Sequence, residues 1–355
     1  MRLLVLGGTE FVGRSVVEAA LGRGWEVTVF NRGRTGPPAG VRSLHGDRTA
    51  PDGLAALAAD DGVWDAVVDT WSAAPRAVRE TARLLRGRAG RYVYVSSRSV
   101  YAWPWPTAGG AAEEGPLVEG ADAGAEATDY ERDKRGGELA AVESFGADGS
   151  LLVRAGMILG PYENVGRLPW WLTRIARGGP VLAPGPRDLA LQYIDARDLA
   201  EWVLGAVERG LGGAYDLVGP SGHTTMGELL ETCAEVTGSA AELRWTDPRV
   251  ILDAGIEPWT QLPVWTPPDT ELSRSAHGGD VSRALATGLV CRPVAETVAD
   301  TWRWLTAIGG SAPRRPDRTP PGLDPEVEAK VLAAAESAAG GTAEDAAGGV
   351  PGTTP

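Results

Sequence analysis

The N-terminal residues carry the feature that most constrains the fold. The apolar run "LLVL" at 3–6 leads directly into two glycines, and "RSVVEAALG" at 14–22 follows with apolar residues at helical spacing. A glycine turn between a strand and a helix lets backbone N–H groups approach a phosphate at the positive end of the helix. Gly7 and Gly13 take the first and third glycine positions of such a turn, whereas Glu10 stands at the second. The sequence therefore predicts a nucleotide-binding turn of altered form.

Short apolar runs alternate with helix-like stretches through the rest of the first half. Strands are expected at 26–33, 65–70 and 91–97, with a helix at 76–87 between the last two. This alternation predicts an α/β fold with a doubly wound parallel (Rossmann) sheet, followed by a smaller, mixed C-terminal part that binds the substrate. Helices of that later part are expected at 168–178, 196–209, 226–237 and 294–307.

The chain is expected to divide into three regions. Residues 1–160 form a dinucleotide-binding Rossmann domain, with returning segments around 190–218, and residues 161–312 form mainly the substrate-binding part. Residues 313–355 comprise a Pro/Arg linker, a short helix with Asp324 as N-cap, and a tail with too few apolar residues to fold. Ligands of open α/β sheets bind beyond the carboxyl ends of the strands, so we expect the site between the two main parts.

Composition excludes several classes of partner. The net charge of −13 argues against nucleic acid, because phosphate backbones are bound by clustered lysine and arginine. No apolar run approaches the ~20 residues of a membrane helix, and "MRLLVL" is too short for a signal peptide core, so we expect a cytoplasmic protein without membrane association. Cys233 and Cys291 form no metal-spaced cluster, and no metal site is expected.

The end of the second expected strand bears on the choice of cofactor. Asn31 and Arg32 stand where an acidic residue would bind a ribose 2′-hydroxyl, whereas an arginine offers a forked cation to a 2′-phosphate. NADP is therefore favoured and NAD remains possible, unless Arg32 is simply a solvated loop residue. Arg34 could assist, and Asp47 is placed to accept from the adenine amino group. The residues expected to bind the cofactor are Gly7, Thr9, Glu10, Phe11, Val12, Gly13, Asn31, Arg32, Arg34, Asp47 and Thr70.

A tyrosine and a lysine stand four residues apart in "YERDK", which places Tyr130 and Lys134 on one face of a helix. Lys134 is notable because only two of the 34 basic residues are lysines, the other being Lys330. A tyrosine with its ordinary pKa of about 10 is a poor base at neutral pH, and a neighbouring ammonium favours the phenolate. Arginine would be charged but could not pass on a proton. The pattern favours acid–base chemistry over the alternative, an exposed i,i+4 pair.

The glycine turn, "SSRSVY", "YERDK", "RAGMILGP" and "QYIDARDLA" together resemble the short-chain dehydrogenase/reductase superfamily over roughly residues 1–310. The resemblance is greatest to its extended and atypical branches, which include NAD-dependent epimerase/dehydratases and isoflavone-reductase-like proteins. It implies that Ser97 hydrogen-bonds the substrate oxygen, that Tyr130 is the general acid/base, and that Lys134 holds the nicotinamide ribose. It also implies that a homodimer is possible, through helices flanking the sheet.

Departures from that family narrow the substrate. Met157 replaces an asparagine that contacts the nucleotide in nucleotide-sugar enzymes, and Leu191 replaces an arginine that grips the diphosphate, so a nucleotide sugar is less favoured. Tryptophans near the expected cleft, including Trp105, offer flat apolar walls for aromatic or alicyclic substrates, although most of the 13 tryptophans are expected to be core residues. The residues expected to bind the substrate are Trp71, Ser97, Tyr101, Trp103 and Met157.

Three functions remain open from the sequence. The favoured one is an NAD(P)-dependent oxidoreductase of secondary metabolism that transfers hydride between the nicotinamide and a small carbonyl or alcohol. The alternative is an epimerase or dehydratase that oxidises its substrate transiently. A non-catalytic binding protein is least favoured, because the Ser97, Tyr130 and Lys134 set is intact. Glu10 either turns outward or pairs with Arg14 or Arg32, or else weakens cofactor binding by repulsion; we expect the first.

Overall fold

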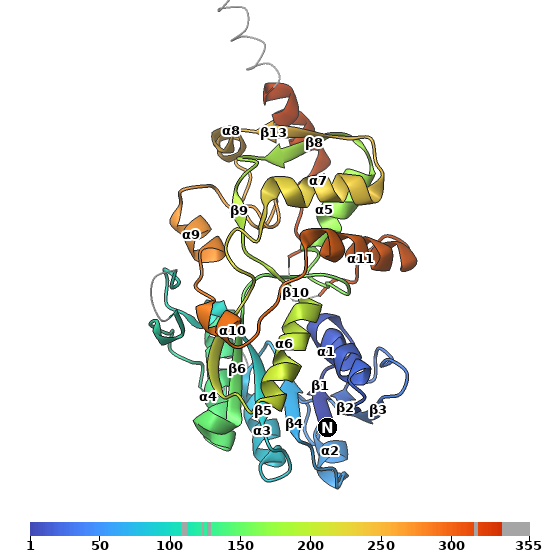
Figure 1. Cartoon of the computed structure of the whole chain (residues 1–355), viewed down its shortest axis with the longest axis vertical. Coiled ribbons are helices and arrows are strands. Elements are labelled where there is room, and N and C mark those ends of the chain that lie inside the picture. Colours follow the sequence, from blue (N-terminus) through green and yellow to red (C-terminus); the bar gives the residue numbers. More distant parts are fainter. Residues whose placement is uncertain (108–111, 123, 126–128, 316–318, 336–355) are drawn as a thin grey trace, which may run out of the picture.

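A seven-stranded parallel sheet forms the lower half of the molecule in a computed structural model (Figure 1). The structure describes residues 1–107, 112–122, 124–125, 129–315 and 319–335. The strand order across the sheet is β3–β2–β1–β4–β5–β6–β11, so the order reverses between β1 and β4. The strands are β1 (Arg2–Leu6), β2 (Glu26–Asn31), β3 (Arg42–His45), β4 (Ala66–Asp69), β5 (Tyr92–Ser97), β6 (Ser150–Ala155) and β11 (Gly213–Leu217).

Helices cover both faces of this sheet, as its buried central strands require. On one face α1 (Phe11–Gly22) packs beside α6 (Ala196–Glu208), and on the other α3 (Pro75–Leu85) packs beside α4 (Tyr130–Gly149). Alternate residues of β1 serve the two faces: Leu3 and Val5 join the core under α1 and α6, while Leu4 and Leu6 join the core under α3 and α4. The short α2 (Ala55–Ala59) follows β3.

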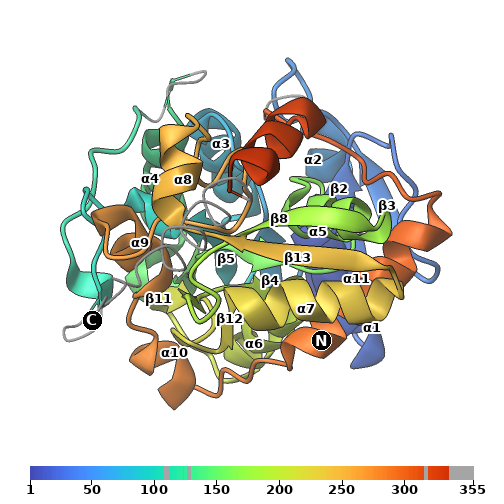
Figure 2. The same cartoon turned by 90° about the horizontal axis from the view of Figure 1, so that it is seen from above.

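A second apolar core fills the upper half of the molecule. It is formed by α5 (Arg167–Ala176), α7 (Met226–Thr237), α11 (Val294–Ala307) and the parallel strand pair β8 (Gly179–Pro184) and β13 (Ala241–Thr246). Viewed from above, these elements lie over the carboxyl-end side of the sheet (Figure 2).

The remaining elements are short. They are the 3₁₀ turns η1 (Arg98–Val100) and η2 (Ala112–Glu114), the strands β7 (Ile158–Leu159), β9 (Ala190–Leu191), β10 (Ile194–Asp195) and β12 (Thr224–Thr225), and the helices α8 (Pro248–Asp253), α9 (Glu271–His277) and α10 (Ser282–Ala286).

The helices expected at 196–209, 226–237 and 294–307 coincide with α6, α7 and α11 to within a residue, and the expected helix 168–178 is α5. A C-terminal helix at 325–335 begins after Asp324, whose carboxylate accepts from the backbone N–H of Glu326 at 2.8 Å. Residues 336–355, which include the expected tail, lie outside the described residues.

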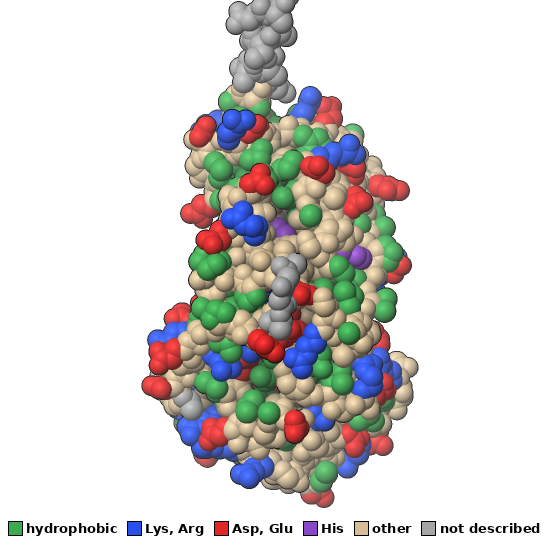
Figure 3. All heavy atoms as spheres, turned by 60° about the vertical axis from the view of Figure 1, so that its left-hand side comes forward, with side chains coloured by type: hydrophobic (Ala, Val, Ile, Leu, Met, Phe, Trp, Pro, Cys, Tyr) green, Lys and Arg blue, Asp and Glu red, His purple; other side chains and the backbone are tan. Residues whose placement is uncertain are grey.

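The surface carries charges of both signs. On the face shown in Figure 3, acidic and basic side chains are interspersed over both halves of the molecule. Among the described residues, no helix combines the length and the apolar character that crossing a bilayer requires.

Candidate active site

A cleft of about 1050 Å³ lies where the carboxyl ends of the sheet strands meet the upper half of the molecule. This is the place at which the strand order reverses, and ligands of doubly wound sheets bind there. All the residues expected to bind the cofactor line it, as do Ser97, Tyr130 and Lys134. The upper half contributes Asn164, Val165 and Arg167, and the segment 313–315 adds a further stretch of wall.

The glycine turn after β1 brings the strand, the helix and the next loop into close approach. Gly7 has a φ of +114°, and a Cβ atom there would lie 2.7 Å from the Thr70 hydroxyl oxygen. A Cβ atom at Gly13 would lie 2.7 Å from the backbone nitrogen of Gly8. Side chains at these two positions would force the turn apart, so the glycines are required by packing as well as by any ligand.

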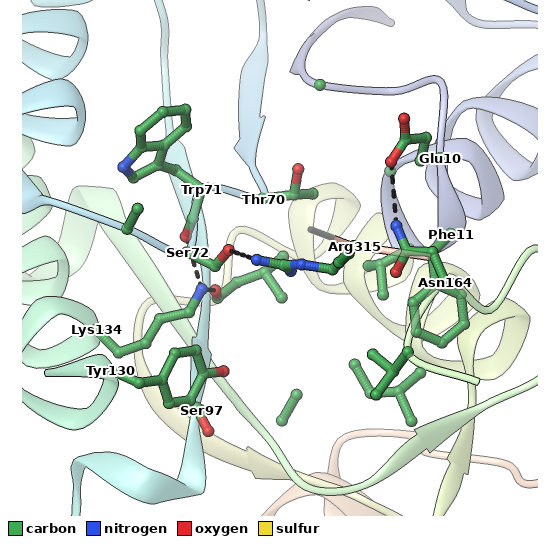
Figure 4. Close-up of a pocket in the computed structure, with 18 of the residues that line it drawn as sticks. Glu10, Phe11, Thr70, Trp71, Ser72, Ser97, Tyr130, Lys134, Asn164 and Arg315 are labelled. Carbon is green, nitrogen blue, oxygen red and sulfur yellow. Dashed lines mark hydrogen bonds between the residues drawn. The ribbon is translucent and has the colours of Figure 1, made fainter. Parts of the chain in front are cut away.

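Glu10 is the N-cap residue of α1, but its side chain makes no capping hydrogen bond. The carboxylate turns instead to the upper half of the molecule, where it accepts from Asn164 Nδ2 at 3.1 Å (Figure 4). Arg14, one of the two arginines considered as its partner, pairs with Glu18 at 2.9 Å. Since the first N–H groups of a helix lack partners within the helix, those of Phe11 and Val12 remain available to an anion in the cleft.

The loop after β2 is shaped by Asn31. Its Oδ1 accepts from the Gly33 backbone N–H at 2.7 Å, which fixes the turn that carries the exposed Arg32 and Arg34 along the cleft. The Asn31 Nδ2 is buried and has no hydrogen-bond partner among the described residues. A buried donor of this kind is costly unless a ligand or water accepts from it.

Asp47 lies across the cleft wall from this loop. Its carboxylate accepts from the Thr49 hydroxyl at 2.7 Å and from the Thr49 backbone N–H at 3.0 Å. These bonds, aided by the charges of Arg32 and Arg34, lower the pKa of Asp47 below its ordinary value. The group is therefore an ionised acceptor at neutral pH, as an adenine amino group would need.

Tyr130 is the first residue of α4, which begins at the N-cap Asp129, whose carboxylate accepts from the Arg132 N–H at 2.9 Å. One turn further, the Lys134 ammonium donates to the backbone carbonyls of Trp71 and Val95, each at 2.6 Å. Lys134 is only 3% exposed, and its position is fixed by the loop after β4 and by β5.

Ser97 ends β5 and lies beside this pair. Its hydroxyl accepts from the Ser99 backbone N–H at 3.1 Å and donates to the Ser99 hydroxyl at 3.2 Å. Figure 4 shows the hydroxyl groups of Ser97 and Tyr130 in the same part of the cleft, with the Lys134 side chain next to Tyr130. The three side chains that the sequence singled out thus come from two segments, β5 and α4, and meet in the same pocket.

A buried polar network that the sequence did not indicate holds α4 against the sheet. The Glu138 carboxylate, fully buried, accepts from Ser96 Oγ at 2.8 Å, from Arg154 Nε at 2.9 Å and from Arg135 Nη1 at 2.8 Å. Ser96 belongs to β5 and Arg154 to β6, so one carboxylate joins two strands to the helix that carries Tyr130. The network therefore fixes the position of α4 relative to β5 and β6.

A second buried ion pair shapes the loop after β4. Arg48 forms a two-pronged contact with Asp69, at 2.7 and 2.8 Å, and Asp69 also accepts from the Trp71 backbone N–H at 2.9 Å. Burial raises the pKa of Asp69, but the Arg48 charge and hydrogen bonds outweigh it and leave the pKa below its ordinary value. Through Trp71, this pair sets the position of a carbonyl to which Lys134 donates.

The expected aromatic wall is present with one correction. Trp71, Trp103 and Met157 line the cleft, and Trp103, which is 52% exposed, meets Trp105 edge to face at 5.9 Å between ring centroids. Tyr101 does not line it: its side chain is buried and its hydroxyl donates to Asp216 at 2.7 Å. The prediction that Tyr101 contacts the substrate is therefore wrong for this structure, because the ring packs into the protein behind the cleft.

Three further lining residues, at 313–315, were missed by sequence reasoning. Arg315 donates from its backbone N–H to the Asn164 carbonyl at 3.2 Å and from its guanidinium to the Ser72 hydroxyl at 3.0 Å. The composition of this segment predicts a linker, and the adjacent arginines in an acidic protein were the signal that could have marked it. No group of His, Cys, Asp or Glu in the described part of the chain is suited to hold a metal ion.

A model of the "NAD dependent epimerase/dehydratase family" matches residues 3–217 of the chain. No curated protein matches it in sequence. Among solved structures, the UDP-glucose 4-epimerase of Thermus thermophilus in complex with NAD is 21% identical, with a TM-score of 0.58, covering 85% of this chain and 99% of the other.

Two enzymes of Bordetella bronchiseptica are similar in the same way. WbmF, in complex with NAD+, is 16% identical with a TM-score of 0.60, covering 95% of this chain and 97% of its own. WbmG, in complex with NAD and UDP, is 17% identical with a TM-score of 0.61, covering 88% of this chain and 97% of its own. At sequence identities this low, the similarity shows a shared fold.

Proposed function

The chain belongs to the NAD dependent epimerase/dehydratase family, and on that premise we propose that it is an NADP-dependent oxidoreductase acting on a small alcohol or carbonyl compound. The observation that carries the proposal is the meeting of Ser97, Tyr130 and Lys134 in the same cleft as the glycine turn. A shared cleft is what hydride transfer requires, since the dinucleotide and the reacting carbon must be in contact.

Two parts of the cleft suit a dinucleotide. The glycine turn and the first N–H groups of α1 suit a pyrophosphate, and the unpartnered Asn31 amide suits an acceptor on the adenosine side. When bound, the cofactor supplies the hydride acceptor or donor. WbmF and the Thermus epimerase, which share this fold, are in complex with NAD, which supports a nicotinamide dinucleotide here.

The protein's own groups handle the proton. Ser97 holds the substrate oxygen by a hydrogen bond, and Tyr130 exchanges a proton with that same oxygen as the carbon changes oxidation state. Lys134, held by two backbone carbonyls, places a positive charge beside the tyrosine and beside the ribose end of the cofactor site. Each role needs a fixed geometry, which the burial of Lys134 supports.

Preference for NADP rests on the loop after β2. Arg32 and Arg34 line the cleft there, and neither position carries the acidic residue that would bind a ribose 2′-hydroxyl. A 2′-phosphate between the two guanidinium groups would receive charge-assisted hydrogen bonds.

The substrate is proposed to be apolar rather than a nucleotide sugar. Trp71, Trp103 and Met157 provide apolar wall at the Tyr130 end of the cleft, and Leu191 is fully buried away from the lining. Because this wall is apolar, it does not suit a ligand such as UDP, which WbmG binds.

An epimerase or dehydratase is the second candidate, and the family match favours it. The two functions differ in where the hydride ends. A reductase leaves a net change in the absorbance of the reduced nicotinamide, whereas an epimerase or dehydratase returns the hydride and leaves none.

The test uses the purified full-length protein with NADPH and small aromatic or alicyclic ketones and aldehydes, and with NADP+ and the matching alcohols. Product analysis accompanies the absorbance so that epimers and dehydrated products are seen. Tyr130→Phe should lower turnover by about 100- to 10,000-fold with cofactor affinity retained. Tyr162→Phe, whose hydroxyl contacts Glu18 outside the cleft lining, is the matched control. Undiminished turnover by Tyr130→Phe would overturn the proposed chemistry.

A further inference from the structure

After α11 the polypeptide does not leave the molecule but crosses the cleft. Pro313, Arg314 and Arg315 all line it, although they lie nearly a hundred residues beyond the last strand of the sheet. These three residues are called the crossing segment below. Among the described residues that follow α11, no others line the pocket.

The Arg315 side chain lies between the two walls of the cofactor site. Its guanidinium reaches Ser72, in the loop after β4, at 3.0 Å, and its backbone N–H is held by the Asn164 carbonyl at 3.2 Å. The same Asn164 donates to the Glu10 carboxylate at 3.1 Å. Figure 4 shows Arg315 extending from the α1 side of the pocket toward Ser72 and Lys134.

Hydrogen bonds hold the described residues that follow the crossing segment against the upper half of the molecule. The backbone N–H of Gly322 donates to the Thr260 carbonyl at 2.9 Å. In the C-terminal helix, the buried Glu328 carboxylate accepts from Arg174 Nε at 2.6 Å and from the Leu182 backbone N–H at 3.1 Å. The crossing segment therefore runs between α11 and a docked helix, so the position of Arg315 is built into the fold.

The charges of Glu10 and Arg315 both bear on how a phosphate would bind here. The turn that faces the pyrophosphate site carries Glu10 where other such turns carry glycine, and its carboxylate would repel a phosphate. An arginine fork is well suited to phosphate oxygens, and the Arg315 guanidinium, which donates to the Ser72 hydroxyl, lies in the wall of the same cleft as the glycine turn. Asn164 links the acid and the arginine through its side chain and its backbone.

We propose that Arg315 is a phosphate-binding residue that contacts the pyrophosphate of the dinucleotide, and that it offsets the charge of Glu10. The inference rests on the proposed function, because it presupposes that a dinucleotide occupies the cleft. The glycine turn then supplies backbone N–H groups, and the crossing segment supplies the cation.

The test measures dissociation constants of NADP+, ADP-ribose and 2′-AMP for the full-length protein by isothermal calorimetry. ADP-ribose keeps the pyrophosphate, whereas 2′-AMP keeps the 2′-phosphate and lacks the pyrophosphate.

Arg315→Ala should weaken the binding of NADP+ and ADP-ribose by roughly 10- to 100-fold and leave the binding of 2′-AMP unchanged. Arg315→Lys, which keeps the charge and loses the fork, should fall between. Arg249→Ala, at an exposed site in α8, is the control, and melting temperatures without ligand report on folding.

The outcomes separate the two proposals. If the wild-type protein binds none of NADP+, NAD+ and ADP-ribose, the proposed function fails and the inference fails with it. If the wild type binds them and Arg315→Ala binds them equally well, the inference alone is overturned. Equal losses for ADP-ribose and 2′-AMP would also overturn it, since they would place Arg315 at the adenosine end rather than at the pyrophosphate.

Discussion

At the scale of single residues, the unusual feature of this cleft is a carboxylate beside a phosphate site. Glu10 leaves the helix end uncapped and instead contacts Asn164. The geometry keeps the N–H groups of the first turn accessible, yet the negative charge remains on the turn. Its cost to an anionic ligand is electrostatic and can be measured without altering the backbone.

Glu10→Gln removes this charge while keeping an oxygen that can accept from Asn164. We expect NADP+ to bind about two- to fivefold more tightly, since an exposed unit charge near a ligand is worth less than about 1 kcal/mol. The gain should shrink at high salt, where the repulsion is screened. Fluorescence titration of NADPH at two salt concentrations measures both effects, with the exposed Glu26→Gln as control. Weaker binding by Glu10→Gln would show that the carboxylate supports the site.

Arg32 decides between the two cofactors in the proposed function. Arg32→Ala should weaken NADP+ by about tenfold or more, because a charge-assisted contact to the 2′-phosphate is lost, and should change the affinity for NAD+ little. The ratio of the two dissociation constants is the readout, and Arg42→Ala, in β3 and outside the cleft lining, is the control. Parallel losses for both cofactors would mean that Arg32 does not read the 2′-phosphate.

At the scale of elements, α4 carries the proposed chemistry and is fixed by charges at its middle. Arg154, from β6, and Ser96, from β5, meet the Glu138 carboxylate in a fully buried position. Such a group is costly if one partner is removed, because the remaining charge stays buried.

Arg154→Met should therefore lower the free energy of unfolding by about 3–5 kcal/mol. Arg76→Met, which breaks an exposed ion pair with Glu80 on α3, should cost less than about 1 kcal/mol. Urea denaturation followed by circular dichroism measures both. A small effect of Arg154→Met would indicate that Arg135 alone satisfies the carboxylate.

The sequence predicted elements well and contacts between distant elements poorly. Apolar periodicity and caps located α6, α7 and α11, because those signals are local to each helix. The motif around Tyr101 did not show that its hydroxyl turns to Asp216, since that partner lies 115 residues away. The crossing segment was hidden for the same reason: its proline and arginine content describes a linker, and only the docked helix beyond it brings Arg315 back to the cleft.

At the scale of the whole molecule, Glu163 lies at the junction of the two halves, between β7 and α5. Its carboxylate is fully buried and accepts from the backbone N–H groups of Arg167 at 2.7 Å and Leu168 at 3.2 Å. Burial raises the pKa of Glu163 to about 7, and the Arg167 charge and these hydrogen bonds offset only part of that rise. The next residue, Asn164, is the one that contacts both Glu10 and Arg315, so the protonation of Glu163 bears on the stability of the cleft wall.

The raised pKa predicts how stability depends on pH. Between the ordinary glutamate value of 4.5 and about 7, folded Glu163 keeps a proton that the unfolded protein has lost, so its contribution to the free energy of unfolding falls as the pH rises through this window and levels off above it. Glu163→Gln cannot ionise and lacks this fall, so the variant should gain stability relative to wild type from pH 5 to pH 8, on the order of a few kcal/mol. Urea titrations across this range measure the difference, with the exposed Glu242→Gln giving the background. Parallel curves for wild type and Glu163→Gln would mean that the buried carboxylate is already ionised at pH 5, with its charge satisfied by the start of α5.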